Sequence, residues 1–171
     1  MKTLIVIDVQ NDFVTGALGT KEAVAVLPNI KKKIDAYLVS GNEVIFTRDT
    51  HGENYLKTNE GRHLPVIHCI KGTEGWQIVK EIDCPGCEHI DKPSFGYTDW
   101  AGLFKDRKMT EIEIVGLCTD ICVISNALIL KAVFPETDIT VDASCCAGVT
   151  PQAHKAALLA MKSCQVNVIG E

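Results

Sequence analysis

Three short, nearly continuous runs of apolar and β-branched residues place the strongest constraint on the fold of this chain. They are residues 3–9, 43–47 and 111–115. Such runs are typical of parallel strands covered on both faces, because a strand with one wet face alternates apolar and polar residues. Between the first two runs, residues 23–38 carry apolar side chains at helical spacing, and Gly41 follows as a helix stop. This order predicts a βαβ unit.

The same alternation continues to the end of the chain. Residues 120–133 and 151–163 have helical patterns, the second with Thr150 as its N-cap. Strands are predicted at residues 138–141 and 166–169 and, from a weaker pattern, at 89–91. This alternation predicts a three-layer α/β/α fold with a mostly parallel, doubly wound sheet. The length of 171 residues fits a single domain spanning residues 1–171.

Composition excludes several classes of function. The formal charge is −5 and no long block of Lys or Arg occurs, which argues against a nucleic-acid partner. No signal-peptide pattern and no apolar run of about 20 residues is present, so we expect no membrane association and a cytoplasmic location. Eight cysteines are too few for a disulfide scaffold of this length, and we expect reduced thiols. The expected partner is a small molecule.

Chemically capable residues stand where the predicted strands end, which is where ligands bind in such folds. Asp8 follows the first strand, Asp49 and His51 follow the second, Lys92 follows the third, and residues 118–122 follow the fourth. The long irregular stretch 50–75 is unusual in a compact domain unless it is functional. We interpret it as a loop that forms part of the site.

Cys122 is the candidate nucleophile because it lies at the start of a predicted helix. The positive end of the helix dipole there predicts a lowered thiol pKa. Asp8 can accept the thiol proton as general base, and Lys92 can stabilise the thiolate and keep Asp8 ionised. Each residue alone has an ordinary interpretation, as a core cysteine, a strand-end cap and a surface lysine. Only their combination predicts catalysis.

The sequence resembles the isochorismatase-like cysteine hydrolases over essentially its whole length. The resemblance rests on five segments in family order, residues 5–13, 47–51, 68–75, 92–95 and 116–123. It implies a catalytic triad of Asp8, Lys92 and Cys122, a cis peptide between Leu117 and Cys118, and an oxyanion hole formed by the N–H groups of Cys118 and Cys122. The implied reaction proceeds through a thioester on Cys122, with Asp8 moving the protons.

A metal site is a further expectation. On spacing alone, Asp49, His51 and His68 also fit ordinary polar loop residues. Resemblance to the nicotinamidase branch implies that they bind one divalent ion, with Zn²⁺ expected and Fe²⁺ or Mn²⁺ chemically acceptable. Glu60 is the favoured fourth ligand and His63 the alternative. In that branch the metal binds the pyridine nitrogen of nicotinamide.

The resemblance also places Phe13 and Leu117 at the substrate pocket, but part of the expected ring cage is missing. Residues 64–67 lack the aromatic side chain that nicotinamidases often carry before the second histidine, and Ile121 stands where tyrosine is frequent. Trp76 or Trp100 could supply the missing face, although the large area that a tryptophan buries favours a structural role for each.

We therefore expect an amidohydrolase that converts nicotinamide to nicotinate and ammonia and, by resemblance, forms a homo-oligomer. One alternative is an amidase for another small carboxamide or carbamoyl compound. A second is a thiol redox or zinc-binding module built on Cys84 and Cys87, whose C-x-x-C spacing otherwise fits a plain turn with two free thiols. A third is a binding protein without catalysis, in which Cys122 would be unreactive.

Overall fold

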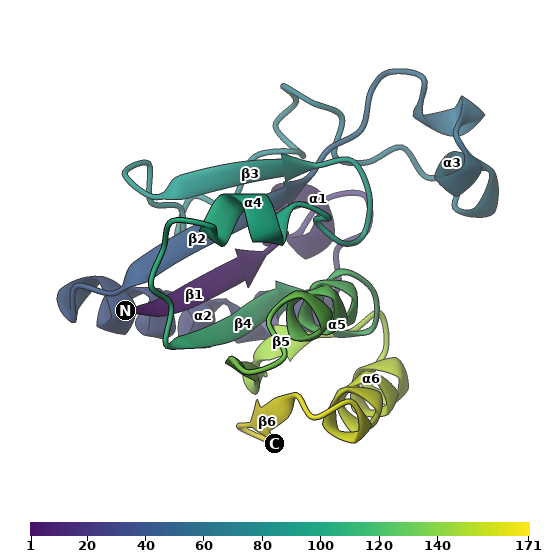
Figure 1. Ribbon diagram of the computed structural model, residues 1–171. Helices are drawn as coiled ribbons and strands as arrows, with labels where there is room; N and C mark the ends of the chain where they lie inside the picture. Colours follow the sequence, from purple (N-terminus) through teal and green to yellow (C-terminus); the bar gives the residue numbers. More distant parts are fainter.

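Six parallel strands form one sheet in the computed structural model, which describes residues 1–171 (Figure 1). The strand order is β3-β2-β1-β4-β5-β6, and every neighbouring pair is parallel. The predicted doubly wound α/β sheet is thereby confirmed. The strands are β1 (Lys2–Ile7), β2 (Glu43–Asp49), β3 (Glu88–Lys92), β4 (Glu111–Leu117), β5 (Asp138–Ala147) and β6 (Asn167–Ile169).

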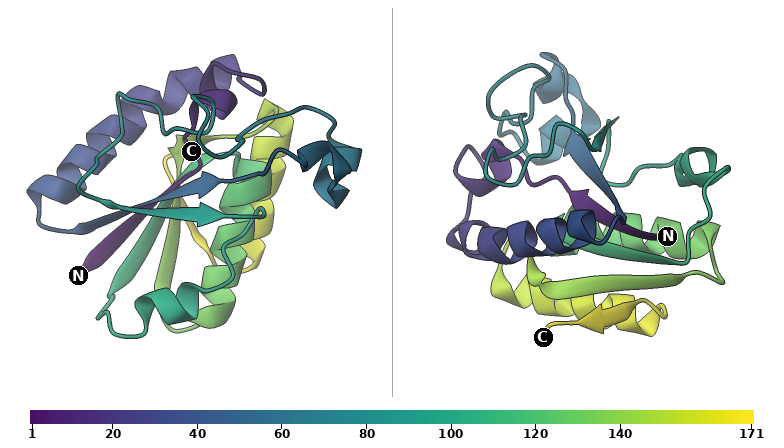
Figure 2. Two further views of the ribbon diagram at one scale, coloured as in Figure 1. Left: turned by 90° about the horizontal axis from the view of Figure 1, so that it is seen from above. Right: turned by 90° about the vertical axis from the view of Figure 1, so that its left-hand side faces the viewer.

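Helices cover both faces of the sheet, which makes the three predicted layers (Figure 2). One face carries α1 (Asn11–Val14) and α2 (Lys21–Val39), and the other carries α4 (Trp100–Phe104), α5 (Ile124–Val133) and α6 (Pro151–Ser163). Each face has its own buried apolar cluster. The short η1 (Tyr55–Lys57) and α3 (Asn59–His63) lie beyond the sheet edge in the predicted site-forming loop. No helix is both long enough and apolar enough to cross a membrane.

Local sequence signals explain where the helices begin and end. The Thr20 hydroxyl accepts a hydrogen bond from the Ala23 N–H at the start of α2, and Thr150 does the same for Ala153 at the start of α6. Such caps satisfy N–H groups that have no partner within the helix. Gly41 follows α2 with φ +67°, a conformation that favours glycine. The predicted cap and stop residues are confirmed.

Two elements differ from the sequence-based prediction. The helix expected at 120–133 begins as one π-helical turn, η2 (Thr119–Val123), before continuing as α5. Single π-helical turns are often found at functional sites. β5 extends six residues beyond its expected end, because Cys146 and Ala147 pair with β4 after a shift in register, although residues 142–147 lack β-branched side chains.

Gly116 allows β4 to run close to β1 beside the site. Its φ is +122°, and an added Cβ would lie 2.1 Å from the Ile7 carbonyl oxygen. Neither the backbone conformation nor the space tolerates a side chain there. The glycine therefore lets the end of β4 lie against the last residue of β1, next to Asp8.

Candidate active site

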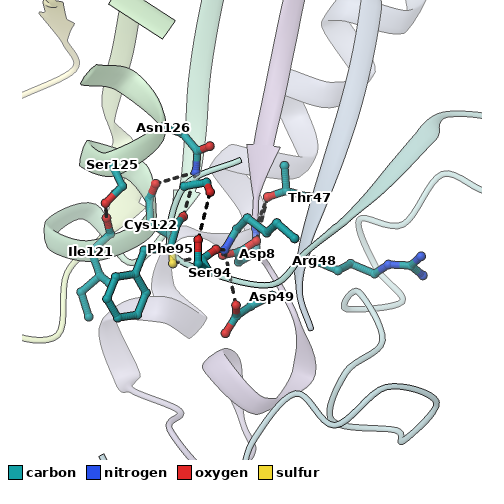
Figure 3. Close-up of polar contacts among 12 residues, drawn as sticks. Asp8, Thr47, Arg48, Asp49, Ser94, Phe95, Ile121, Cys122, Ser125 and Asn126 are labelled. Atoms are coloured by element: carbon teal, nitrogen blue, oxygen red, sulfur yellow. Dashed lines mark hydrogen bonds and ion pairs between the residues drawn. The ribbon is translucent and has the colours of Figure 1, made fainter. Parts of the chain in front are cut away.

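The direction in which strands are added to the sheet changes between β1 and β4, which is the switch point of the sheet. The three predicted catalytic residues lie beside it, and Figure 3 labels two of them, Asp8 and Cys122. Asp8 directly follows β1, Lys92 is the last residue of β3, and Cys122 lies in η2 after β4. Asp8 has φ 47°, which turns the chain sharply at the strand end. Aspartate is among the few residues besides glycine that adopt this conformation at modest cost. The strand-end rule therefore correctly predicted that these three residues lie together.

The three side chains are buried and in contact. Lys92 Nζ lies 2.6 Å from Asp8 Oδ2 and 3.5 Å from Cys122 Sγ. Asp8 Oδ1 accepts a hydrogen bond from the Thr47 hydroxyl at 2.7 Å, whereas Oδ2 accepts none, because the Lys92 ammonium is near but not aligned as a donor. One carboxylate oxygen is therefore anchored, and the other is free to exchange a proton.

Burial dominates the acid–base properties of this group. It raises the pKa of Asp8 despite the opposing charge of Lys92, and it raises the pKa of the Cys122 thiol well above its usual value. Burial alone would lower the pKa of Lys92, but the charges of Asp8, Cys122 and Asp49 raise it. The predicted lowering of the Cys122 pKa is therefore wrong, because burial and the charge of Asp8 raise it. The expectation that Lys92 holds Asp8 ionised is likewise outweighed by burial.

The peptide bond between Leu117 and Cys118 is cis, as the resemblance implies. Cys118 lines the cavity together with Cys122. Leu117 itself was expected at the substrate pocket, and this prediction is wrong. Its side chain is 1 % exposed and packs in the apolar cluster between the sheet and α2, because the last residue of β4 points to that face.

Asp49, His51, Glu60 and His68 offer four ligand atoms that all lie within 4.8 Å of one another. His51 Nε2 is 3.0 Å from Asp49 Oδ2 and 3.5 Å from Glu60 Oε1, and His68 Nε2 is 3.6 Å from Asp49 Oδ2. The Val66 carbonyl, 2.8 Å from His68 Nδ1, fixes that nitrogen as the donor and leaves Nε2 free as a ligand. The favoured Glu60 belongs to the group, whereas His63 is exposed and faces the Asn59 carbonyl.

These four residues fit a divalent metal ion. Two imidazole nitrogens and two carboxylates are a donor set suited to first-row divalent ions. Asp49 Oδ1 is buried without a hydrogen-bond partner, as expected of a carboxylate that completes its contacts with a ligand. Burial tends to raise the pKa of Asp49, but hydrogen bonds with His51 and His68 hold it well below its usual range. Asp49 is therefore ionised and available to a cation.

A cavity of about 320 Å³ lies between the catalytic group and the metal ligands. The Phe13 ring packs edge-on against His68, with 5.5 Å between the ring centroids. Phe13 lines the cavity, as the resemblance implies. The wall contains two carboxylates and no Lys or Arg side chain. The lining residues are Phe13, Leu18, Thr20, Asp49, Glu60, Leu64, His68, Phe95, Cys118, Ile121, Cys122 and Val149.

Sequence reasoning missed several residues of this wall. Val149 follows β5 and would have been found by the strand-end rule if the true end of β5 had been recognised. Phe95 lies three residues after Lys92, so its place near the site could have been inferred, but no periodic pattern marks its direction. Neither Trp76 nor Trp100 lines the cavity. Trp76 stacks on Arg48 and Trp100 is fully buried beside Phe104, so both have the structural role that was favoured.

Cys84 and Cys87 lie before β3, whereas Lys92, the candidate catalytic lysine, is its last residue. Both are free thiols in a turn closed by a hydrogen bond from the Cys87 N–H to the Cys84 carbonyl. Burial raises the pKa of Cys87 to about 12, which disfavours a reactive thiolate. His89, the nearest additional candidate ligand, faces Asp83 and the Cys87 carbonyl. The geometry is that of a plain turn.

Comparison with known proteins defines the class to which this fold and site belong. Residues 2–170 match the sequence model of the isochorismatase domain. The chain therefore belongs to the isochorismatase family. The predicted enzyme class, an amidohydrolase of the nicotinamidase branch, is confirmed by relatives named nicotinamidase.

Individual relatives span most or all of the chain. The uncharacterized isochorismatase family protein PncA of Bacillus subtilis is 31% identical over 74% of this chain and 76% of its own length. The nicotinamidase/pyrazinamidase of Mycobacterium tuberculosis is 26% identical over 99% of this chain and 98% of its own. The crystal structure of the pyrazinamidase of Pyrococcus horikoshii in complex with zinc superposes with a TM-score of 0.87, at 27% identity and with 99% of each chain covered.

Proposed function

We propose that this protein hydrolyses nicotinamide, or a closely similar neutral aromatic carboxamide, to the carboxylic acid and ammonia, with Cys122 as the covalent nucleophile. The observation that carries the proposal is the contact of Asp8 and Cys122 with Lys92 beside a cavity that Cys122 lines together with three of the four candidate metal ligands. A nucleophile beside a base and a cation is the arrangement that covalent amide hydrolysis requires.

In the first half of the reaction, Asp8 takes the Cys122 thiol proton as the sulfur attacks the amide carbonyl carbon. Burial raises the pKa of both the Asp8 carboxyl and the Cys122 thiol, which favours a proton transfer concerted with attack over a separate thiolate. We propose that the N–H groups of Cys118 and Cys122 stabilise the oxyanion. Protonated Asp8 then gives its proton to the leaving amine, the C–N bond breaks, and ammonia departs from the thioester.

In the second half, water adds to the thioester carbonyl while Asp8 removes its proton. The C–S bond then breaks, the acid is released, and the proton returns to the Cys122 sulfur. One water is consumed for each amide bond. Lys92 remains charged throughout, which its raised pKa supports, and offsets the negative charge that passes between sulfur and carboxylate.

We propose that Asp49, His51, Glu60 and His68 hold zinc, with iron and manganese as the alternatives. The donor set supports this assignment, as does the zinc complex of the P. horikoshii relative. A bound divalent ion would supply a Lewis-acidic partner for a ring nitrogen and so orient the carboxamide toward Cys122. Phe13 packs against His68, one of the proposed ligands, and so limits the orientations that the substrate ring can take.

The charges in the cavity favour a neutral substrate. The charge of a bound divalent ion would be offset by Asp49 and Glu60, and no lysine or arginine lines the cavity to pair with a substrate carboxylate. Acidic carbamoyl compounds would therefore place an unpaired negative charge in a largely apolar pocket. This weighs against the carbamoyl alternative and favours amides of uncharged aromatic rings.

The test is ammonia release from nicotinamide by the metal-loaded protein, by chelated protein, and by Cys122→Ala. We expect turnover in the first, a marked loss in the second that Zn²⁺, Fe²⁺ or Mn²⁺ restores, and a loss of roughly 10³-fold or more in the third. Cys164→Ala, which removes an exposed thiol, is the matched control and should retain full activity.

Two results would contradict the proposal in different ways. Absence of nicotinamide turnover with every metal, while Cys122 reacts with a thiol label, would leave an amidase for a different carboxamide. An unreactive Cys122 would support a binding protein without catalysis. Loss of function in Cys84→Ser/Cys87→Ser, but not in Cys122→Ala, would favour the redox or zinc-binding alternative.

A further inference from the structure

Asn126 connects the turn that carries Cys122 to the wall of the cavity (Figure 3). It lies in the first turn of α5 and is fully buried. Its amide N–H₂ donates to the Cys122 carbonyl at 2.8 Å and to the Phe95 carbonyl at 3.1 Å. Its amide oxygen accepts from the Tyr97 N–H at 2.9 Å and from the Trp100 indole N–H at 3.2 Å. Both donors and both lone pairs of the side chain are therefore used.

The orientation of this amide is fixed by its surroundings. A flipped amide would point its oxygen at the two carbonyls and its N–H₂ at the two N–H donors, so all four contacts would become repulsive. The four partner groups come from two separate parts of the chain, the nucleophile turn and residues 95–100. No shorter side chain at position 126 can bridge them, and truncation would leave several of these groups unpaired.

The segment between β3 and α4 is held from both sides of the catalytic group. Lys92 Nζ donates to the Ser94 carbonyl at 3.0 Å, and Asn126 donates to the next carbonyl, that of Phe95. The Phe95 ring lines the cavity and is 45 % exposed, so packing alone does not fix it. Its position depends on the backbone bonds that link it to Lys92 and to the turn of Cys122.

We propose that Asn126 is a positioning residue that sets the distance between the Cys122 sulfur and the cavity wall formed by Phe95. The inference rests on the proposed function, in which Cys122 attacks a ring-bound carboxamide. The buried amide of Asn126 then fixes the distance between the Cys122 sulfur and a substrate that is held against Phe95. Misplacement by about 1 Å can cost roughly 100-fold in rate, so such a link matters for the chemical step.

Ser125 provides a natural control in the same turn. Its hydroxyl donates to the Ile121 carbonyl at 2.6 Å, four residues back, as Asn126 does to the Cys122 carbonyl. Ser125 makes no side-chain hydrogen bond to residues 95–100. If these hydrogen bonds only held the π-helical turn, substitutions at positions 125 and 126 would lower activity to a similar extent. If Asn126 also bridges to residues 95–100, substitution at position 126 will lower activity more.

The experiment compares Asn126→Ser, Asn126→Asp and Ser125→Ala in the zinc-loaded protein. Asn126→Ser keeps a hydroxyl that can bond to the Cys122 carbonyl but cannot reach Phe95. Asn126→Asp keeps an oxygen that can accept from Tyr97 and Trp100 but loses both N–H donors. We expect kcat for nicotinamide to fall about 10- to 100-fold in both Asn126 variants, more than KM rises, and to stay within about threefold of wild type in Ser125→Ala. Zn²⁺ affinity should be unchanged, because Asn126 contacts none of the proposed ligands.

A double-mutant comparison separates positioning from general loss of structure. Phe95→Ala should lower kcat/KM clearly in the wild-type background and much less in Asn126→Ser, where the link is already broken. Wild-type kcat in Asn126→Ser, or an equal effect of Phe95→Ala in both backgrounds, would overturn the proposal. Asn126→Asp, which preserves side-chain volume, decides the question if Asn126→Ser does not fold. Wild-type turnover and Cys122→Ala test the proposed function separately.

Discussion

Two lysines, the buried Lys92 and the partly buried Lys33, each lie between two carboxylates, but their surroundings differ. Lys92 is fully buried and lies 2.6 Å from Asp8 and 3.5 Å from Asp49. Lys33, on α2, is 18 % exposed and forms ion pairs with Glu113 of β4 and, at 2.5 Å, with Asp142 of β5. The same set of charges therefore occurs at two places on the sheet.

The difference lies in the hydrogen bonds that the carboxylate oxygens accept. Around Lys33, Tyr37 donates to Glu113 at 2.6 Å, and the Ser144 N–H and hydroxyl donate to Asp142 at 2.9 and 2.7 Å. In the Lys92 group, Asp8 Oδ2 and Asp49 Oδ1, the two oxygens that face the ammonium, accept no hydrogen bond. Satisfied polar groups stabilise a fold, whereas unsatisfied oxygens are available to a proton or a metal. The surroundings of Lys33 therefore suit stability, and those of Lys92 suit the proposed chemistry.

The largest effect on kcat is expected when Lys92 is replaced, because this substitution separates the role in catalysis from the role in stability. Lys92→Met should lower kcat by about 10³-fold or more, because the charge that offsets the thiolate is lost. The free energy of unfolding should fall less than in Lys33→Met, since the large cost of burying an ammonium disappears and burial already raises the pKa of Asp8, which favours its protonated form. Ammonia release and urea denaturation of the same preparation measure both quantities. A large loss of stability would contradict the division of roles.

Lys33→Met should show the opposite pattern. We expect wild-type kcat and a loss of about 3 kcal/mol in the free energy of unfolding, because two partly buried carboxylates lose their cation. Burial tends to raise the pKa of Asp142, but hydrogen bonds from Lys33 and Ser144 lower it below its usual value. The stabilisation is therefore fully present above the ordinary aspartate pKa of about 4 and is lost as the pH falls through the lowered folded value.

Urea denaturation at pH 7 and at pH 3 checks the pH dependence of this loss. The difference between wild type and Lys33→Met should shrink at pH 3, because the carboxylates take up protons. A difference that is the same at both pH values would show that lost packing, not charge, explains the effect.

Addition of metal tests whether Asp49 Oδ1, which accepts no hydrogen bond, is available to an ion. At a zinc concentration 100 times its dissociation constant, the free energy of unfolding should rise by about 2.7 kcal/mol, seen as a higher melting temperature. Asp49→Asn should abolish most of this gain. His63→Ala is the matched control, because His63 neighbours Glu60 in α3 but faces away from the ligand group. Equal losses in both variants would argue against the assigned ligands.

The smallest effect is expected at Ser144. Ser144→Ala removes the hydroxyl bond to Asp142 and leaves the backbone bond in place, so the free energy of unfolding should fall by about 1 kcal/mol with kcat unchanged. Denaturation and ammonia release again provide the two readouts. A change in kcat would mean that the two lysine clusters are coupled, which the comparison does not predict.

The sequence predicted the fold and the placement of the site because both depend on patterns that survive without tertiary context. Sequence patterns located all six strands, and the strand-end rule placed Asp8, Lys92 and Cys122 at one edge. The end of β5 was missed because residues 142–147 lack β-branched side chains, and the strand continues there through the pairing of Cys146 and Ala147 with β4.

Side-chain environment was harder to predict than position. The pKa of Cys122 depends on how much water is excluded around it, which no spacing reveals, and burial reversed the expected direction. Leu117 was assigned to the pocket although strand geometry turns it into the core. The four hydrogen bonds of Asn126 involve residues distant in sequence and were likewise invisible to pattern reasoning.

All four proposed metal ligands lie within residues 49–68, whereas the catalytic triad needs the ends of three strands. Bringing together groups that are close in sequence costs little loop entropy, while the triad exists only after β1, β3 and β4 have joined one sheet. The two halves of the site therefore differ in their order of assembly. Local opening of residues 49–68 would release the ion while the sheet, and with it the nucleophile, stays assembled.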